Sequence, residues 1–203
     1  MKQVLVIHGG NTFENYGEFL DSLKNKDINL DYFRSQPGWK DGLARALGPD
    51  FDVFAPFMPN ASNAQYGEWK IWFGRILELM DDGVILVGHS LGGVFLPKYL
   101  SENVSPKKIK AVFLVAAPFD DEGGAEKLAS FALKSPLENF AHQAGEIHLF
   151  HSQDDPCVPF AQLSKYQTSL SAAQPHIFTD RGHFRQEEFP EIVELIKNLW
   201  KVV

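Results

Sequence analysis

Ser90 is the central residue of a G-x-S-x-G pentapeptide at 88–92, a spacing that presents a serine hydroxyl for nucleophilic attack. An apolar, β-branched run at 84–87 precedes it, and a helical pattern at 94–100 follows it. The flanking glycines carry no side chains, so a strand and a helix can approach closely on either side of a sharp turn. Such a turn also holds the serine in a strained backbone conformation. The pattern therefore predicts a strand, a tight turn that exposes Ser90, and a helix.

The chain also contains a base and an acid that could activate this hydroxyl. A serine is a weak nucleophile near neutral pH, so it needs a general base within hydrogen-bond reach and a carboxylate that orients the base. The loop at 153–159, after the apolar run at 147–150, carries aspartates, and His183 lies on a loop before the expected C-terminal helix. We therefore predict that Ser90 is the nucleophile, that His183 is the base, and that the acid comes from the loop at 153–159.

Backbone amides near Ser90 are expected to stabilise the oxyanion that attack on an acyl carbonyl creates. Loss of one such donor typically costs about 2.7–4 kcal/mol of activation free energy. The first donor should be the N–H of Leu91, directly after the nucleophile, and the second should come from Gly10 or Asn11 in the turn after the first strand. His8 is expected to order this turn rather than to transfer protons, and His89 to pack beneath Ser90.

Six short apolar runs predict strands, and most are separated by helical patterns. The expected strands cover residues 4–7, 51–54, 84–87, 111–116, 147–150 and 176–178. Apolar residues at helical spacing predict a helix over 64–80, with Ser62 and Gln65 as its capping box, and another helix near the C-terminus. Strands that alternate with helices pair in parallel and are covered on both faces. We predict an α/β fold with a mostly parallel sheet of about six strands.

Two connections, 11–36 and 118–145, are longer than normal and follow the C-terminal ends of strands, where open α/β sheets bind ligands. Their aromatic side chains are candidates either for a pocket wall or for ordinary core packing. These aromatics are Phe13, Tyr16, Phe19, Tyr32, Phe33, Phe119, Phe131 and Phe140. An apolar wall would favour uncharged substrates with hydrophobic bulk.

Composition narrows the class of protein. A length of 203 residues suits one domain spanning 1–203. The net charge of −7 opposes binding to nucleic acid. Cys157 is the only cysteine, so no internal disulfide forms, which indicates a reducing compartment. The apolar run at 4–7 is too short for a signal peptide, and no run is long enough to span a bilayer. We therefore expect a cytoplasmic chain without membrane insertion.

Four motifs follow one another in a familiar order. They are a strand ending in Gly-Gly at 8–11, Gly-His-Ser-x-Gly at 88–92, Asp-Asp-Pro-x-x-Pro at 154–159 and Gly-His-Phe at 182–184. On these motifs the chain resembles, over nearly its full length, the α/β-hydrolases of the small serine hydrolase family that includes retinoblastoma-binding protein nine and the bacterial YdeN-like proteins. The resemblance implies an α/β-hydrolase fold, with Asp155 as the acid that orients His183.

Two other aspartates compete with Asp155 for this role. Asp154 is its neighbour on one turn, and because adjacent side chains on a turn point apart, at most one of the two faces His183. Asp120 follows the fourth expected strand, which is an alternative location for the acid in some α/β-hydrolases.

The function predicted from these features is hydrolysis of small to medium carboxylic esters, or of amides or thioesters, through an acyl-serine that needs no metal or organic cofactor. One alternative is a protein-binding module on a hydrolase scaffold. Binding to the retinoblastoma protein would be expected through Leu-x-Cys-x-Glu, which the sequence around Cys157 does not match. A further alternative keeps the same three residues but makes the enzyme a lyase, a C–C hydrolase or a perhydrolase.

Overall fold

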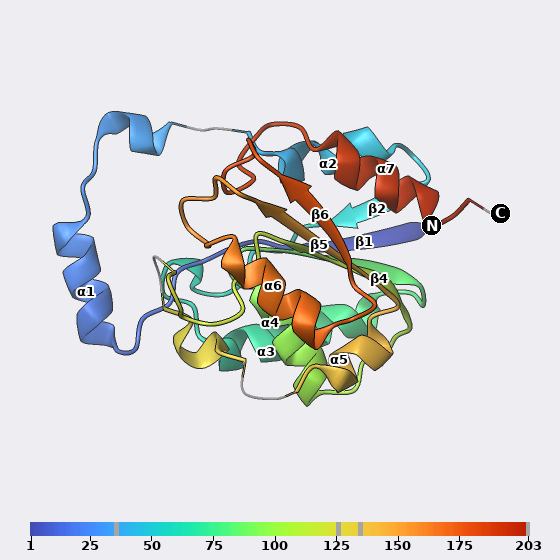
Figure 1. Ribbon diagram of the computed structural model, residues 1–203, viewed down its shortest axis with the longest axis horizontal. Coiled ribbons are helices and arrows are strands. Elements are labelled where there is room, and N and C mark those ends of the chain that lie inside the picture. The colour runs from blue at the N-terminus through green and yellow to red at the C-terminus, as the bar shows by residue number, and fades with distance from the viewer. Residues whose placement is uncertain (35–36, 125–126, 134–135, 202–203) are drawn as a thin grey trace.

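The computed structural model describes residues 1–34, 37–124, 127–133 and 136–201, and its centre is one parallel sheet (Figure 1). The strands are β1 (Lys2–Ile7), β2 (Phe51–Phe54), β3 (Val84–His89), β4 (Ile109–Val115), β5 (Glu146–Ser152) and β6 (Gln174–Phe178). They lie in the order β2-β1-β3-β4-β5-β6, and every neighbouring pair is parallel. The predicted α/β class with a parallel sheet is confirmed.

Helices cover both faces of this sheet (Figure 1). Within the described residues they are α1 (Tyr16–Asn25), α2 (Trp39–Leu47), α3 (Tyr66–Leu79), α4 (Leu91–Glu102), α5 (Glu138–Gln143), α6 (Ala161–Ser169) and α7 (Pro190–Asn198). One face packs against α2 and α7, and the other against α3 to α6. None of the described helices combines the length and the apolar composition that a bilayer crossing requires.

The strand side chains alternate between two cores. Leu5 and Leu86 belong to the core beneath α3 and α4, whereas Val4 and Ile85 belong to the core beneath α2 and α7. A strand covered on both faces needs apolar residues at successive positions, because neighbouring side chains point to opposite sides of the sheet. This requirement explains why the central strands appear in the sequence as uninterrupted apolar runs.

Helix α3 begins two residues later than predicted, and the capping box expected from Ser62 and Gln65 is wrong. Residues Ala61–Asn63 form a 3-10 turn of their own, and Gln65 is the N-cap without a side-chain capping bond. The backbone N–H groups of Glu68 and Trp69 instead donate to the Gln65 carbonyl oxygen, at 3.1 Å each. The first N–H groups of the helix are thus bound by a backbone carbonyl, and not by the side-chain cap that the sequence predicted.

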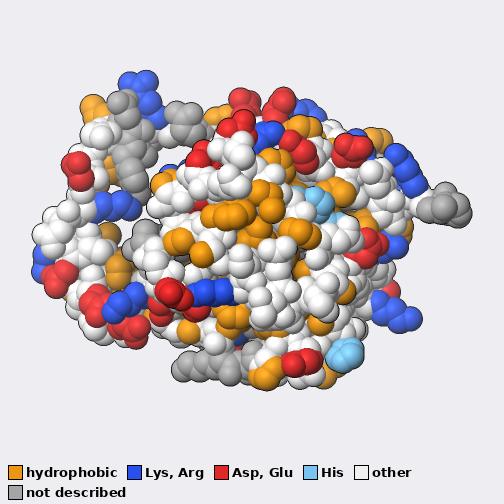
Figure 2. All heavy atoms as spheres, viewed as in Figure 1, with side chains coloured by type: hydrophobic (Ala, Val, Ile, Leu, Met, Phe, Trp, Pro, Cys, Tyr) orange, Lys and Arg blue, Asp and Glu red, His pale blue; other side chains and the backbone are white. Residues whose placement is uncertain are grey.

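The segment 11–36 contains α1, which lies beside the main body of the molecule (Figure 1). Asn15 caps this helix by accepting a hydrogen bond from the Glu18 N–H at 3.0 Å, and no residue of α1 is buried. Figure 2 shows acidic and basic side chains mixed in the region of α1, at the left of the view. Helix α1 is therefore exposed to solvent rather than packed into either core.

Of the two alternatives for the aromatics of the long connections, a pocket wall is not formed by the described side chains, none of which lines the cavity at Ser90. Phe131 and Phe140 are completely buried in the core, whereas Tyr16 and Phe33 are exposed. Phe13 packs on Phe19, and Phe119 packs on Tyr166. The side chain of Tyr32 lies outside the described part of the structure. Phe131 and Phe140 of 118–145 therefore serve the core, and Tyr16 of α1 lies exposed to solvent.

Candidate active site

Ser90 occupies a strained turn between β3 and α4. Its φ of 55° and ψ of −120° lie outside the regions that residues with side chains ordinarily adopt. A Cβ at Gly88 would collide with the Gly92 carbonyl, and a Cβ at Gly92 would collide with the Ile7 carbonyl. Both glycines are therefore required by close backbone approach, and the turn holds the Ser90 hydroxyl clear of the strand end.

His183 lies beside this hydroxyl. Its Nε2 is 2.9 Å from Ser90 Oγ, so the serine hydroxyl can donate to an imidazole nitrogen. The ring comes from the loop between β6 and α7, and its residue is buried, with 8% exposure. Two residues that are 93 positions apart in the chain are thus brought within hydrogen-bond distance.

Asp155 contacts the other nitrogen of the same ring. His183 Nδ1 lies 2.9 Å from Oδ2 and 3.1 Å from Oδ1 of Asp155, whose side chain is fully covered. The backbone N–H groups of Cys157 and Val158 donate to Oδ1, at 2.8 and 3.0 Å. Burial alone would raise the pKa of Asp155, but these hydrogen bonds and that from His183 outweigh it and lower the pKa. The carboxylate is thus held ionised.

The rival aspartates have different partners. Asp154 Oδ1 accepts hydrogen bonds from the Ser152 hydroxyl, at 2.5 Å, and from the Gly182 N–H, at 2.9 Å. Asp120 is bound through both oxygens by the Lys165 ammonium, at 2.8 and 2.7 Å. Of the three aspartates, Asp155 is therefore the one whose carboxylate is hydrogen-bonded to His183.

The three expected oxyanion donors differ in their availability. Among the described residues, the N–H groups of Leu91 and Gly10 have no hydrogen-bond acceptor, and both residues line the pocket at Ser90. The Asn11 N–H instead donates to the Ala61 carbonyl at 2.8 Å. Asn11 therefore fixes the turn, which leaves Gly10 as the donor that this segment can offer.

His8 holds the same turn from the other side. Its Nε2 accepts a hydrogen bond from the Met58 N–H at 2.8 Å, so the ring proton is on Nδ1, which lies 2.6 Å from the Gly9 carbonyl oxygen. A Cβ at Gly10 would come within 2.7 Å of the Ala61 carbonyl oxygen. The hydrogen bonds of His8 thus restrict the backbone that presents the Gly10 amide, and the close approach of Ala61 requires a glycine at position 10.

His89 and Lys40 form a chain of hydrogen bonds that ends on the backbone of His183. No sequence motif indicated that Lys40 takes part. Lys40 Nζ lies 3.1 Å from His89 Nδ1, and His89 Nε2 lies 2.9 Å from the His183 carbonyl oxygen. The ammonium must donate, so His89 accepts through Nδ1 and donates through Nε2. Burial, together with the charges of Lys40 and His183, holds the pKa of His89 well below its usual range. His89 is therefore a neutral strut beneath the turn, in keeping with the expectation that it packs there.

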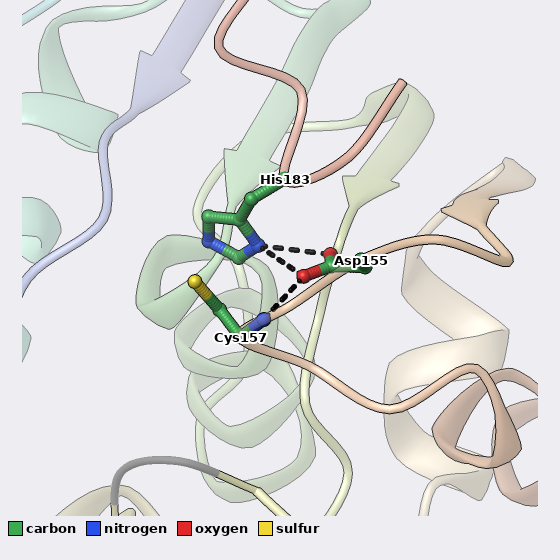
Figure 3. A group of neighbouring side chains, drawn as sticks. All are labelled: Asp155, Cys157 and His183. Carbon is green, nitrogen blue, oxygen red and sulfur yellow. Dashed lines mark hydrogen bonds and ion pairs between the residues drawn. The ribbon is translucent and has the colours of Figure 1, made fainter. Parts of the chain in front are cut away.

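Cys157 is the third member of a group that Figure 3 shows together with Asp155 and His183. The thiol, carboxylate and imidazole ligand atoms lie within 4.8 Å of one another. Sulfur, nitrogen and oxygen donors of this kind suit Zn²⁺. A metal ion at this position would compete with the hydrogen bond between His183 and Asp155, because the imidazole and the carboxylate would each have to direct a lone pair toward the metal.

A cavity of about 510 Å³ opens in front of Ser90. Its lining comes from the turn after β1, from α2, from the loops after β4 and β5, and from the loop that carries His183. These are the carboxyl ends of the parallel strands, where α/β folds bind ligands. The site therefore brings a serine hydroxyl, an imidazole, an ionised carboxylate and free backbone amides together at one edge of the sheet.

This sheet, with its strained serine turn between β3 and α4, defines an α/β-hydrolase. The YdeN protein of B. subtilis has the same fold, with a TM-score of 0.76 and 18% identity over 98% of this chain and 99% of that one. The thioesterase domain of the curacin biosynthetic pathway aligns with a TM-score of 0.62 and 16% identity, over 97% of this chain and 91% of that one.

Sequence comparison places the chain within a family. The model of the family described as serine hydrolase matches residues 35–198, and the chain belongs to this family. The serine hydrolase RBBP9 of Rattus norvegicus is 29% identical over 166 residues, which cover 80% of this chain and 86% of that protein. The resemblance inferred from the four sequence motifs is therefore confirmed.

Proposed function

We propose that this serine hydrolase cleaves small to medium carboxylic esters through an acyl-serine intermediate. In this proposal Ser90 is the nucleophile, His183 transfers the proton and Asp155 orients and stabilises the imidazole. The observation that carries the proposal is one continuous chain of hydrogen bonds, with 2.9 Å from Ser90 Oγ to His183 Nε2 and 2.9 Å from His183 Nδ1 to Asp155 Oδ2.

Acylation begins when Ser90 Oγ attacks the ester carbonyl carbon and its proton passes to His183 Nε2. The carbonyl π electrons move onto oxygen, and the N–H groups of Leu91 and Gly10 donate hydrogen bonds that stabilise this oxyanion. When the tetrahedral intermediate collapses, the bond to the alcohol oxygen breaks and His183 Nε2 gives its proton to that oxygen. The products of this half-reaction are the free alcohol and the acyl-serine.

Deacylation repeats these steps with water in place of Ser90. Water loses a proton to His183 Nε2 and attacks the acyl carbon, and Ser90 Oγ leaves and recovers the proton. Asp155 remains ionised throughout, because its role is to hold the ring and to stabilise the imidazolium. The same machinery would serve amides and thioesters, so the ester preference concerns the substrate rather than the steps.

Labelling with a fluorophosphonate probe tests this proposal directly. The probe should add to Ser90, and Ser90→Ala should abolish labelling and lower turnover of 4-nitrophenyl butyrate by about ten-thousand-fold or more. Ser62→Ala is the matched control, because Ser62 lines the same cavity. It should keep both labelling and turnover. Stoichiometric labelling of another residue, or undiminished turnover in Ser90→Ala, would refute the proposal.

A further inference from the structure

The cavity at Ser90 is rich in positive charge although the chain carries a net charge of −7. Lys40, Lys127 and Arg185 line it, and Asp120 is the acidic residue among its described lining. The Lys165 ammonium lies 2.7 Å from Asp120 Oδ2, so that carboxylate is already paired. The charge of the cavity is therefore locally opposite to that of the molecule.

Lys40 is the cavity cation that is most in need of a negatively charged partner, because it is partly buried and its hydrogen-bond partner is a neutral imidazole. Its ammonium donates to His89 Nδ1, and among the described residues no carboxylate oxygen lies within 4 Å of it. Burial lowers the pKa of Lys40. The charge of Asp41 opposes this effect, and the Arg185 guanidinium adds to it more weakly. A half-buried ammonium is costly to hold without an anion in direct contact, and Asp41 acts on Lys40 only from beyond salt-bridge distance.

Both cations lie on the side of Ser90 where His183 stands. Lys40 reaches His183 through His89, which hydrogen-bonds the His183 carbonyl oxygen at 2.9 Å. Arg185 follows His183 by two residues, and its Nη2 lies 3.9 Å from the Cys157 sulfur. In the proposed mechanism His183 Nε2 protonates the departing alcohol oxygen, so the alcohol portion of the substrate must occupy this side.

We propose that Lys40 and Arg185 bind an anionic group, a carboxylate or a phosphate, on the alcohol portion of the ester. The inference rests on the proposed function, because it uses the direction in which the leaving group departs. Arg185 offers a planar fork of donors that matches either anion, and Lys40 adds a point charge close to the reacting centre. The preferred substrates are then esters with a negatively charged alcohol, in contrast to the uncharged esters expected from the aromatic residues.

The test compares matched ester pairs. The butyrate ester of 4-hydroxybenzoate carries the carboxylate, the butyrate ester of 4-hydroxybenzamide is its neutral counterpart, and the butyrate ester of 4-hydroxyphenyl phosphate supplies the phosphate arm. For each enzyme the readout is kcat/KM for the anionic ester divided by kcat/KM for the neutral ester. Division of the variant's ratio by the wild-type ratio cancels the intrinsic reactivity of the esters.

Lys40→Gln and Arg185→Gln should each lower this ratio by about tenfold, the effect of losing one charge-assisted contact. Lys108→Gln is the matched control, because it removes the same charge from an exposed position just before β4, at the opposite end of the sheet. Its ratio should equal that of the wild type. Added salt should also lower the wild-type ratio, since Arg185 is an exposed residue and its charge is screened by salt.

The outcomes separate this inference from the function on which it rests. Ratios that stay unchanged in Lys40→Gln and Arg185→Gln, or that fall equally in Lys108→Gln, would overturn the anion site while neutral-ester turnover and Ser90 labelling persist. An effect confined to an anion on the acyl side, with mono-4-nitrophenyl succinate measured against 4-nitrophenyl butyrate, would also overturn it. A fall with only the carboxylate or only the phosphate ester would support the site and identify its ligand. If the wild-type protein showed neither turnover of any of these esters nor labelling by the fluorophosphonate, the proposed function itself would be refuted.

Discussion

Asp154 accepts a hydrogen bond from the backbone N–H of Gly182, 2.9 Å away and one residue before His183. The neighbouring N–H of Arg181 donates to the Ser152 hydroxyl at 3.0 Å, and that hydroxyl donates to Asp154. The loop that follows β5 is therefore tied to the loop that carries His183. Two adjacent aspartates thus have separate tasks: Asp155 contacts the imidazole, and Asp154 holds the backbone on which the imidazole is mounted.

This division predicts a clear order among aspartate variants. Asp155→Asn should lower turnover of 4-nitrophenyl butyrate by about ten-thousand-fold, because an amide no longer holds the required tautomer and charge of His183. Asp154→Ala should lower it by about tenfold, the scale of one lost hydrogen bond that positions the loop. Asp120→Asn should change it least, since its partner is Lys165. A larger loss in Asp154→Ala than in Asp155→Asn, measured by steady-state kinetics, would contradict this assignment.

The buried side chain of His148 should make the free energy of unfolding depend on pH. Its ring is stacked on Phe113, with centroids 4.6 Å apart, and its Nδ1 lies 3.0 Å from His176 Nε2. Burial, reinforced by His176, lowers the pKa of His148 to about 4. Above pH 6.5 the residue is neutral in both the folded and the unfolded chain, so its contribution is complete there. Below pH 6.5 the unfolded chain takes up the proton first, and stability falls until about pH 4.

The expected slope from this one group is up to about 1.4 kcal/mol per pH unit within that window. Urea unfolding at pH 7.5, 5.5 and 4.5 measures it. His148→Gln should flatten the decline, whereas His142→Gln, an exposed substitution on α5, should leave the decline as it is. Equal slopes for the wild type and His148→Gln would show that this histidine is not the source.

Two glycines of the α2 region should respond to alanine in opposite ways. Gly42 lies in the interior of α2, and the nearest atom to a Cβ there would be a guanidinium nitrogen of Arg45, 3.9 Å away. Gly42→Ala should therefore raise the free energy of unfolding by about 0.5–1 kcal/mol, through helix propensity alone. Gly48 caps the same helix with a φ of 87°, so Gly48→Ala should lower the free energy of unfolding.

Thermal and urea unfolding of the two variants beside the wild type would check this pair. Open space surrounds a Cβ at Gly48, so a loss there would report backbone strain rather than collision. A stabilising Gly48→Ala would contradict the helix end as it is described.

Local pattern was enough for the sheet and for the order of the chemical groups. Strands covered on both faces must be apolar at successive positions, so the stretches around Leu86 and Val112 could be recognised without neighbours. The strained turn at Ser90 can be recognised in the sequence because it requires glycines at fixed positions on either side. The loops that carry Asp155 and His183 could be located because the carboxyl ends of parallel strands share one edge of the sheet.

The directions and partners of side chains were decided only by the tertiary structure. Lys40 and His89 are 49 positions apart, and no periodicity links them, so their contact depends on how α2 packs against the sheet. The same holds for Asn11, whose N–H is taken by the Ala61 carbonyl, and for Phe131, which fills the core instead of the cavity. Each of these outcomes is a choice among competing neighbours. That choice follows from packing and hydrogen-bond satisfaction across the whole fold, which a local sequence pattern does not encode.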